Sequence, residues 1–169
     1  DRVKVLLETK ATGLIEENGR VTGVAVESRG KTAKVFGTRG VILSTGGFGA
    51  NVEFRQKVNT GIWKEANLDK EIGCSNISVA AQGDGLLMAE KVNADLIGLA
   101  DIQVHPNGTP GTGLMLDIKT SGRNRLFINT NGDRFVDEGA PRDVLSKAVF
   151  AQPGQTFWLV QNHLRYPDE

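Results

Sequence analysis

An α+β fold is predicted for this chain of 169 residues, and three features of the sequence predict it. Residues 2–44 alternate apolar segments with Asn-Gly and Arg-Gly turns, which is typical of a β-meander. The apolar residues 41–44 then lead into a glycine-rich turn at residues 46–49, a strand–turn–helix pattern. Beyond this turn, helical and hairpin patterns alternate. We therefore expect a β-rich unit over residues 1–58 and an α+β unit over residues 59–169.

The composition excludes several classes of protein. Twenty basic residues balance twenty acidic ones, so no net charge attracts nucleic acid or an anionic membrane. The single cysteine, Cys74, excludes an intramolecular disulfide, and with only His105 and His163 we expect no metal site. No apolar run approaches the ~20 residues of a transmembrane span. We expect a soluble protein, with the cytoplasm favoured over the periplasm.

Both ends of the sequence predict that it is a fragment of a longer protein. It opens within the strand-like residues 3–7 without a start methionine. It closes soon after another strand-like segment, residues 157–160. We therefore expect the sequence to be a fragment, whose two boundaries fall within or close to strands of a longer protein.

Turn and capping residues place the elements of the first unit. Asn18-Gly19 is a strong hairpin signal, because both central residues of the favoured two-residue turn need a positive φ. Arg29-Gly30 predicts a second turn, so that three strands form the meander. Asn51 is placed to cap a short helix over residues 52–58.

Two further helices are predicted in the second unit. One begins at the Gly83-Asp84-Gly85 turn, with Asp84 as its N-cap. The other spans about residues 141–151, with Pro153-Gly154 as its stop. The apolar face of the latter is predicted to carry Val144, Leu145, Ala148 and Val149.

The remaining elements of the second unit are extended. Residues 96–104 lead to His105-Pro106, where the proline disfavours helix at the preceding residue. A hairpin is predicted from residue 126 to residue 136, with its turn at residues 130–133.

These motifs occur in a familiar order along the chain. The order is Ser-Thr-Gly-Gly-Phe-Gly-Ala-Asn, Gly-Asp-Gly-Leu-Leu-Met-Ala, Gln-Val-His-Pro, Asn-Gly-Asp-Arg-Phe-Val-Asp-Glu, Pro-Arg-Asp and Gln-Pro-Gly-Gln. It resembles the fumarate reductase and succinate dehydrogenase flavoprotein family over essentially the whole sequence. The most similar branch is that of the soluble flavocytochrome c type reductases.

The resemblance implies a division of labour and a cofactor. Residues 1–58 would be part of an FAD-binding domain, and residues 59–169 would be the capping domain that closes over the flavin. The GxGxxG segment that grips the FAD pyrophosphate in the family is absent from this sequence. We therefore expect the isolated chain to bind FAD poorly and to be inactive, with an electron donor domain or protein elsewhere in the parent.

The resemblance also assigns residues to the cofactor. The glycine-rich turn would supply backbone contacts to the flavin, and the turn at residues 83–85 would add a helix N-terminus. Ala11 lies where the family approaches the adenine end of FAD. The cofactor-binding candidates are Ala11, Thr45, Gly46, Gly47, Gly83, Asp84 and Gly85.

Two residues are assigned to the chemistry by the same resemblance. Arg142 would protonate the substrate carbon, although an arginine at a helix start is also common on surfaces. His105 would bind a substrate carboxylate, although a lone histidine is often structural. His163, with no motif around it, is interpreted as a surface residue.

One segment departs from the family pattern. Family members that reduce dicarboxylates carry a Thr or Ser, then Glu and later Arg, beginning twelve residues after the histidine. Asp117, a candidate substrate contact, begins that register here. Ile118 and Ser121 replace the Glu and Arg of the proton relay. A small unsaturated acid other than fumarate therefore fits better as the substrate.

Two alternatives to a reductase of unsaturated acids remain. A non-catalytic flavoprotein or interaction module would account for the loss of the relay residues. A ketosteroid-type flavin dehydrogenase, which runs the reverse reaction, resembles the chain less, because the only tyrosine is Tyr166.

Overall fold

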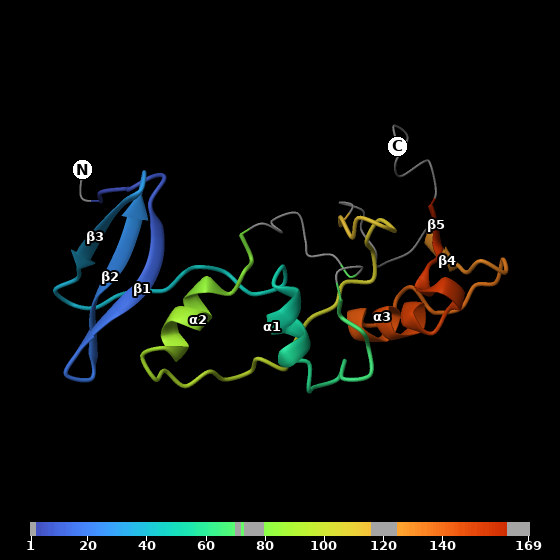
Figure 1. Cartoon of the computed structure of the whole chain (residues 1–169). Coiled ribbons are helices and arrows are strands. Elements are labelled where there is room, and N and C mark those ends of the chain that lie inside the picture. Colours follow the sequence, from blue (N-terminus) through green and yellow to red (C-terminus); the bar gives the residue numbers. More distant parts are fainter. Residues whose placement is uncertain (1–2, 70–71, 73–79, 116–124, 162–169) are drawn as a thin grey trace.

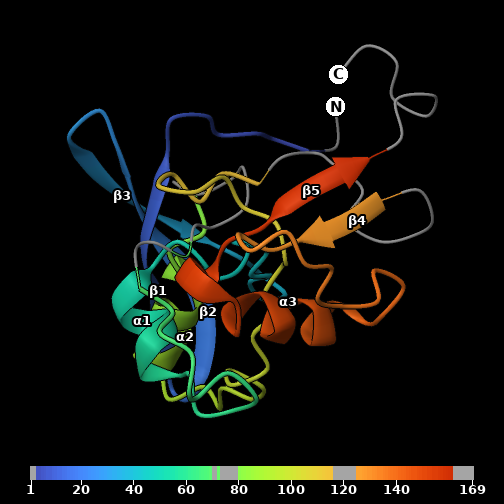
Figure 2. The same ribbon diagram turned by 90° about the vertical axis from the view of Figure 1, so that its right-hand side faces the viewer.

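A computed structural model describes residues 3–69, 72, 80–115 and 125–161. The described part contains a three-stranded sheet and a two-stranded sheet, with helices between them along the molecule (Figure 1). The mixture of small sheets and short helices confirms the α+β class. Figure 2, a view along the long direction, shows α3 lying below the β4–β5 pair.

The first sheet is the predicted meander. Strands β1 (Lys10–Glu17), β2 (Arg20–Ser28) and β3 (Lys31–Phe36) pair antiparallel in sequence order. Asn18 and Gly19 take φ values of 54° and 78°, as the two-residue turn requires. The turn residues Asn18-Gly19 and Arg29-Gly30 therefore predicted this sheet correctly.

Two expected strands are absent from the described residues. Residues 3–7 and 41–44 pair with no other described strand. Apart from the half-buried Val41, their apolar side chains are exposed, and Ile42 reaches 91% exposure. Both predictions rested on apolar runs, but a strand also needs a partner edge for its backbone N–H and C=O groups. Nothing in the described part of the chain supplies that edge.

The first helix, α1 (Val52–Lys57), begins as predicted. The Asn51 side chain accepts a 3.0 Å hydrogen bond from the Phe54 N–H. Phe54 is buried and meets Phe48 edge to face, with ring centroids 5.0 Å apart. The helix is thereby packed against the glycine-rich turn that precedes it.

The second helix, α2 (Asp84–Glu90), corrects one expectation. Its N-cap is Gly83, in the left-handed conformation, and no side chain caps the helix. Asp84 is the first helical residue, so its carboxylate lies in the first turn, where the helix dipole favours an anion. The prediction that Asp84 caps the helix is wrong by one position.

The C-terminal half packs around α3 (Arg142–Phe150) and the β4 (Arg125–Ile128) and β5 (Trp158–Gln161) pair. The short 3₁₀ helix η1 (Pro153–Gln155) follows α3, close to the predicted stop. The hairpin predicted at residues 126–136 reduces to a single bridge between Ile128 and Arg134 and a turn in which the Asn129 N–H donates to the Asp133 carbonyl at 2.9 Å. β4 pairs along its other edge with β5, a partner distant in the sequence that the local pattern did not predict.

The core of this half is aromatic and aliphatic. Phe127 is fully buried and stacks on Phe157, with ring centroids 4.4 Å apart. Leu145 of α3 is 1% exposed, as predicted for its apolar face, but Val144 is 44% exposed. The buried position after Leu145 belongs to the polar Ser146 instead.

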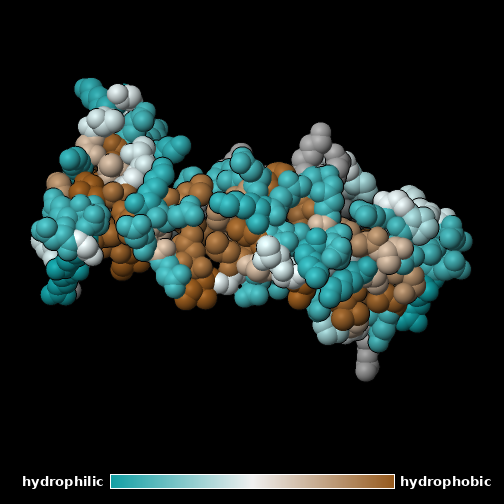
Figure 3. All heavy atoms as spheres, turned by 60° about the horizontal axis from the view of Figure 1, so that its bottom comes forward, coloured by the Kyte–Doolittle hydropathy of each residue, from teal (hydrophilic) through white to brown (hydrophobic). Residues whose placement is uncertain are grey.

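Apolar side chains also reach the surface. Figure 3 shows brown apolar atoms along the middle of the molecule, between the teal polar groups. Ile42, Ile97, Val3 and Leu7 are among the most exposed of the large apolar residues.

Candidate functional site

Two glycine turns distant in the sequence are joined by hydrogen bonds. The Gly83 N–H donates to the Gly47 carbonyl at 3.0 Å, and the Ala50 N–H donates to the Ala81 carbonyl at 2.9 Å. The Asn51 amide, besides capping α1, donates to the Gln82 carbonyl at 3.0 Å. The cofactor-binding candidates of both turns therefore form one structural unit.

Glycine is needed where these turns meet. A Cβ at Gly83 would lie 3.0 Å from the Phe48 Cβ, and the backbone there has φ +78°. A Cβ at Gly85 would lie 2.0 Å from Thr45 Oγ1, far inside van der Waals contact. By contrast, a Cβ at Gly46 or Gly47 would meet nothing within 4 Å. Gly83 and Gly85 therefore allow the two turns to pack closely. Gly46 and Gly47 instead leave open space next to their exposed backbone.

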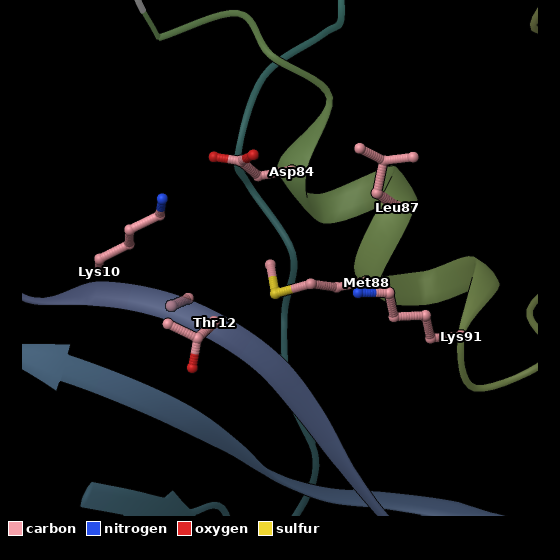
Figure 4. Close-up of a pocket in the computed structure, with 7 residues that line it drawn as sticks. Lys10, Thr12, Asp84, Leu87, Met88 and Lys91 are labelled. Carbon is pink, nitrogen blue, oxygen red and sulfur yellow. The ribbon is translucent and has the colours of Figure 1, made fainter. Parts of the chain in front are cut away.

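A small cavity of about 230 Å³ lies between β1 and α2 (Figure 4). Lys10, Ala11 and Thr12 line it from the strand, and α2 contributes Asp84 and Met88 among others. Figure 4 shows the Met88 side chain extending toward the strand. The structure thus brings two cofactor-binding candidates, Ala11 and Asp84, to one cavity.

A larger cavity of about 1220 Å³ contains the two candidates for the chemistry. His105 lines it from the segment before Pro106, and Arg142 lines it from the first residue of α3. The Arg142 Nη1 donates to Gln103 Oε1 at 2.6 Å. Aromatic and aliphatic side chains form much of the remaining wall, including Trp158, Phe157, Ile102 and Met115.

The environment of His105 favours its neutral form. Burial lowers the pKa of His105 below its usual 6.5, and the charge of Arg142 lowers it further. Hydrogen bonding to the side chain and then the backbone of Asn107 opposes this shift in pKa. Separately, a long contact of 3.5 Å joins the backbone N–H of Asn107 to Nδ1 of His105. With Nδ1 as the acceptor, the neutral tautomer carries its hydrogen on Nε2. That N–H is a donor suited to an oxyanion.

Arg55 is a feature that the sequence interpretation missed. It is 5% exposed, and its guanidinium donates to the Leu68 carbonyl at 2.7 Å and to the Gly49 carbonyl at 2.6 Å. It also donates to the carbonyls of Asp69 and Ile72. Arg55 therefore connects the glycine-rich turn to the loop around residue 69. Its position in a short helix carried no signal of this role.

Other predicted residues fall outside the described structure. They are Asp117 with its neighbours Ile118 and Ser121, and also Cys74, His163 and Tyr166. Among the residues that are described, no cluster of three His, Cys, Asp or Glu side chains could hold a metal ion. The described helices are all too short or too polar to cross a membrane.

Comparison with known sequences identifies the family. The family described as "FAD binding domain" matches residues 1–165. The chain belongs to this FAD-binding family. The resemblance to fumarate reductase flavoproteins is confirmed, and FAD is the cofactor that the family binds.

The relatives of this chain include reductases. It is 38% identical to NADH:acrylate oxidoreductase of Vibrio harveyi over 96% of the chain and 16% of that protein. It is also 38% identical to urocanate reductase of Eggerthella lenta, over 95% of the chain and 26% of that protein. The chain therefore spans about a quarter or less of these relatives.

Solved structures share the fold. The open conformation of a flavocytochrome c3 fumarate reductase superposes with a TM-score of 0.68 at 26% identity, over 95% of the chain and 27% of that protein. A 3-ketosteroid Δ1-dehydrogenase of Sterolibacterium denitrificans superposes with a TM-score of 0.60 at 21% identity, over 94% of the chain and 27% of that protein. The latter similarity is one of fold alone.

The backbone of the glycine-rich turn is compatible with a flavin nucleotide, the cofactor of the family. Exposed backbone at Gly46 and Gly47 faces open space, as a closely approaching ring or phosphate requires. Lys10 and Lys91 line the smaller cavity together with the acidic Asp84, so both signs of charge and hydrogen-bond donors and acceptors are present for a nucleotide there.

Proposed function

We propose that the chain is part of an FAD-dependent oxidoreductase that reduces the carbon–carbon double bond of a small unsaturated carboxylic acid. The observation that carries the proposal is the meeting of His105 and Arg142 at one cavity, from separate elements of the fold. The names of the relatives, which specify acrylate, urocanate and fumarate, support the substrate class.

The bound flavin, once reduced by its electron donor, would supply the hydride, and the residues of this chain would supply binding and a proton. The neutral imidazole of His105 donates its Nε2–H to a carboxylate oxygen of the acid. This donation draws electron density from the conjugated double bond and orients the acid in the cavity. Ala11, Thr45, Gly46, Gly47, Gly83, Asp84 and Gly85 belong in this proposal to the FAD site.

Arg142 provides the proton in this proposal. Arg142 lines the same cavity as His105, and its hydrogen bond to Gln103 restrains its guanidinium. A cation in the first turn of α3 opposes the helix dipole, so helix stability alone does not favour arginine there. Proton donation to the second carbon of the double bond accounts for its presence.

The domain assignment is part of the same proposal. Residues 1–58 contribute to the FAD-binding domain, and residues 59–169 form the capping domain. Asp117 is proposed as a further substrate contact. An electron donor domain or protein completes the enzyme.

Arg142→Lys in the full-length flavoenzyme tests the proposed function. Lysine keeps the charge but loses the planar guanidinium and its reach. Losing a general acid costs about 100-fold to 10,000-fold in turnover, while reduction of the flavin by its electron donor stays intact. The exposed Arg39 gives a matched control, and Arg39→Lys should leave turnover unchanged. Turnover of Arg142→Lys within a few-fold of the parent would refute the role of Arg142.

A further inference from the structure

Two contacts join α3 to the segment that carries His105. Arg142 Nη1 donates to Gln103 Oε1 at 2.6 Å, and Ser146 Oγ donates to the Val104 carbonyl at 2.9 Å. Arg142 and Ser146 lie one helical turn apart, so their side chains leave the same face of α3. The helix thus holds two consecutive residues, directly before His105.

The Ser146 contact is the buried one of the two. Ser146 is 2% exposed, whereas Arg142 is exposed. Because the Ser146 hydroxyl is buried, breaking its bond to the Val104 carbonyl would leave a buried polar group without that partner, which costs free energy. The Ser146–Val104 contact therefore restrains the backbone more strongly than a surface contact would.

The same segment is restrained at both of its ends. The indole Nε1–H of Trp63, a residue only 3% exposed, donates to the Ile102 carbonyl at 2.8 Å. On the other side, Pro106 restricts the backbone of His105. Between these two points, Arg142 and Ser146 both link the segment to α3, and Ser146 is the buried one of the two.

We propose that Ser146 is a positioning residue, which fixes His105 relative to Arg142 by holding the Val104 carbonyl against α3. Because α3 also carries Arg142, one rigid helix sets the separation of the two groups on the cavity. Only the catalytic consequence of this inference rests on the proposed function. The positional consequence can be measured without substrate or flavin.

The pKa of the His105 imidazole depends on its position in the fold. Burial and the nearby Arg142 charge lower its pKa, while Asn107 opposes the shift. If the segment loosens, the imidazole becomes more exposed and moves away from Arg142, so its pKa rises toward 6.5. The sequence has two histidines, and a His163→Gln background leaves a single imidazole signal.

The first experiment is an NMR titration of His105 in the 169-residue chain carrying His163→Gln. Ser146→Ala should raise the pKa of His105 by roughly 0.3 pH units or more, and Ser146→Thr, which retains a hydroxyl, should restore it. Val144→Ala, on the exposed side of α3, should leave it unchanged. Leu145→Val, which weakens the core beside Ser146 without removing the bond, should also leave it unchanged.

Two results would overturn the positioning role. One is an unchanged pKa of His105 in Ser146→Ala. The other is an equal rise in Leu145→Val, which would assign the effect to general destabilisation of α3.

The second experiment measures turnover in the full-length flavoenzyme. Ser146→Ala should raise KM for the acid and lower kcat, each by about three-fold to thirty-fold. Both parameters change because His105, which binds the carboxylate, and Arg142, which donates the proton, are no longer held at a fixed separation. A shifted His105 pKa with unchanged kinetics would retain the positioning role and refute the proposed part of His105 in the reaction. Changed kinetics with an unshifted pKa would refute the positioning role.

Discussion

Thr45 Oγ1 occupies the space into which a side chain at Gly85 would project, only 2.0 Å from the position of its Cβ. Gly85 lies inside α2, where glycine is normally about 1 kcal/mol worse than alanine. The close contact with Thr45 explains why glycine is tolerated there. The contact also ties α2 to the glycine-rich turn, which is the proposed flavin side of the site.

Gly85→Ala should therefore destabilise the chain, although helix propensity alone predicts the opposite. Overpacking of this kind costs about 1–3 kcal/mol in the free energy of unfolding, measurable by urea denaturation. Thr45→Ala should rescue part of the loss in the double variant. Gly13→Ala is the control, since a Cβ there meets nothing within 4 Å. A more stable Gly85→Ala chain would contradict the contact.

Arg55→Lys should weaken the connection between the glycine-rich turn and the loop around residue 69. One ammonium cannot reproduce the fork that serves four carbonyls, so buried acceptors lose their donors. We expect a loss of about 2–4 kcal/mol in the free energy of unfolding. Lys57→Ala, an exposed change on the same helix, should cost far less. Equal losses for the two variants would show that Arg55 makes no special connection.

His105 should make the chain less stable at mildly acidic pH. Its folded pKa lies below 6.5 because burial and then Arg142 disfavour the charged form. The unfolded state therefore binds more protons below pH 6.5, and stability falls as the pH drops from there through the folded pKa. His105→Gln should flatten this dependence in urea denaturation at a series of pH values. An unchanged slope would show that His105 is not the group responsible.

Glu138 should stabilise the loop that leads to α3. Its side chain is 4% exposed, accepts the Phe127 N–H at 2.9 Å and pairs with Arg134 at 2.6 Å. Glu138→Ala leaves that buried N–H without a partner and should cost about 2–3 kcal/mol in the free energy of unfolding, whereas Glu138→Gln keeps an acceptor and should cost about 1 kcal/mol. Urea denaturation of the two variants distinguishes these values.

The contribution of Glu138 should also depend on pH. Burial alone raises the pKa of Glu138, but the hydrogen bonds from Arg134 and the Phe127 backbone, together with the Arg134 charge, hold it below 4.5. Its stabilising effect is therefore present above pH 4.5 and is lost as the pH falls through the lower folded pKa. A difference between wild type and Glu138→Gln that persisted at low pH would refute this origin.

The sequence by itself determined the features that neighbours along the chain control. Asn18-Gly19 set the first hairpin, because its two positive φ values suit one turn geometry. Asn51 set the start of α1, because its side chain reaches an N–H three residues later. Motifs in a family order also indicated an FAD-binding fold, which the family match confirmed.

Only the tertiary structure decided the features that depend on distant partners. The apolar residues 41–44 form no strand in the described structure, because a strand needs a paired edge as well as an apolar run. Thr45 against Gly85, and Ser146 against Val104, are contacts between segments that no local pattern connects. Such contacts arise when packing brings separate elements together. The number of residues between two positions in the sequence does not predict the distance between them in the fold. For that reason the sequence could nominate His105 and Arg142, but only the fold placed both at one cavity.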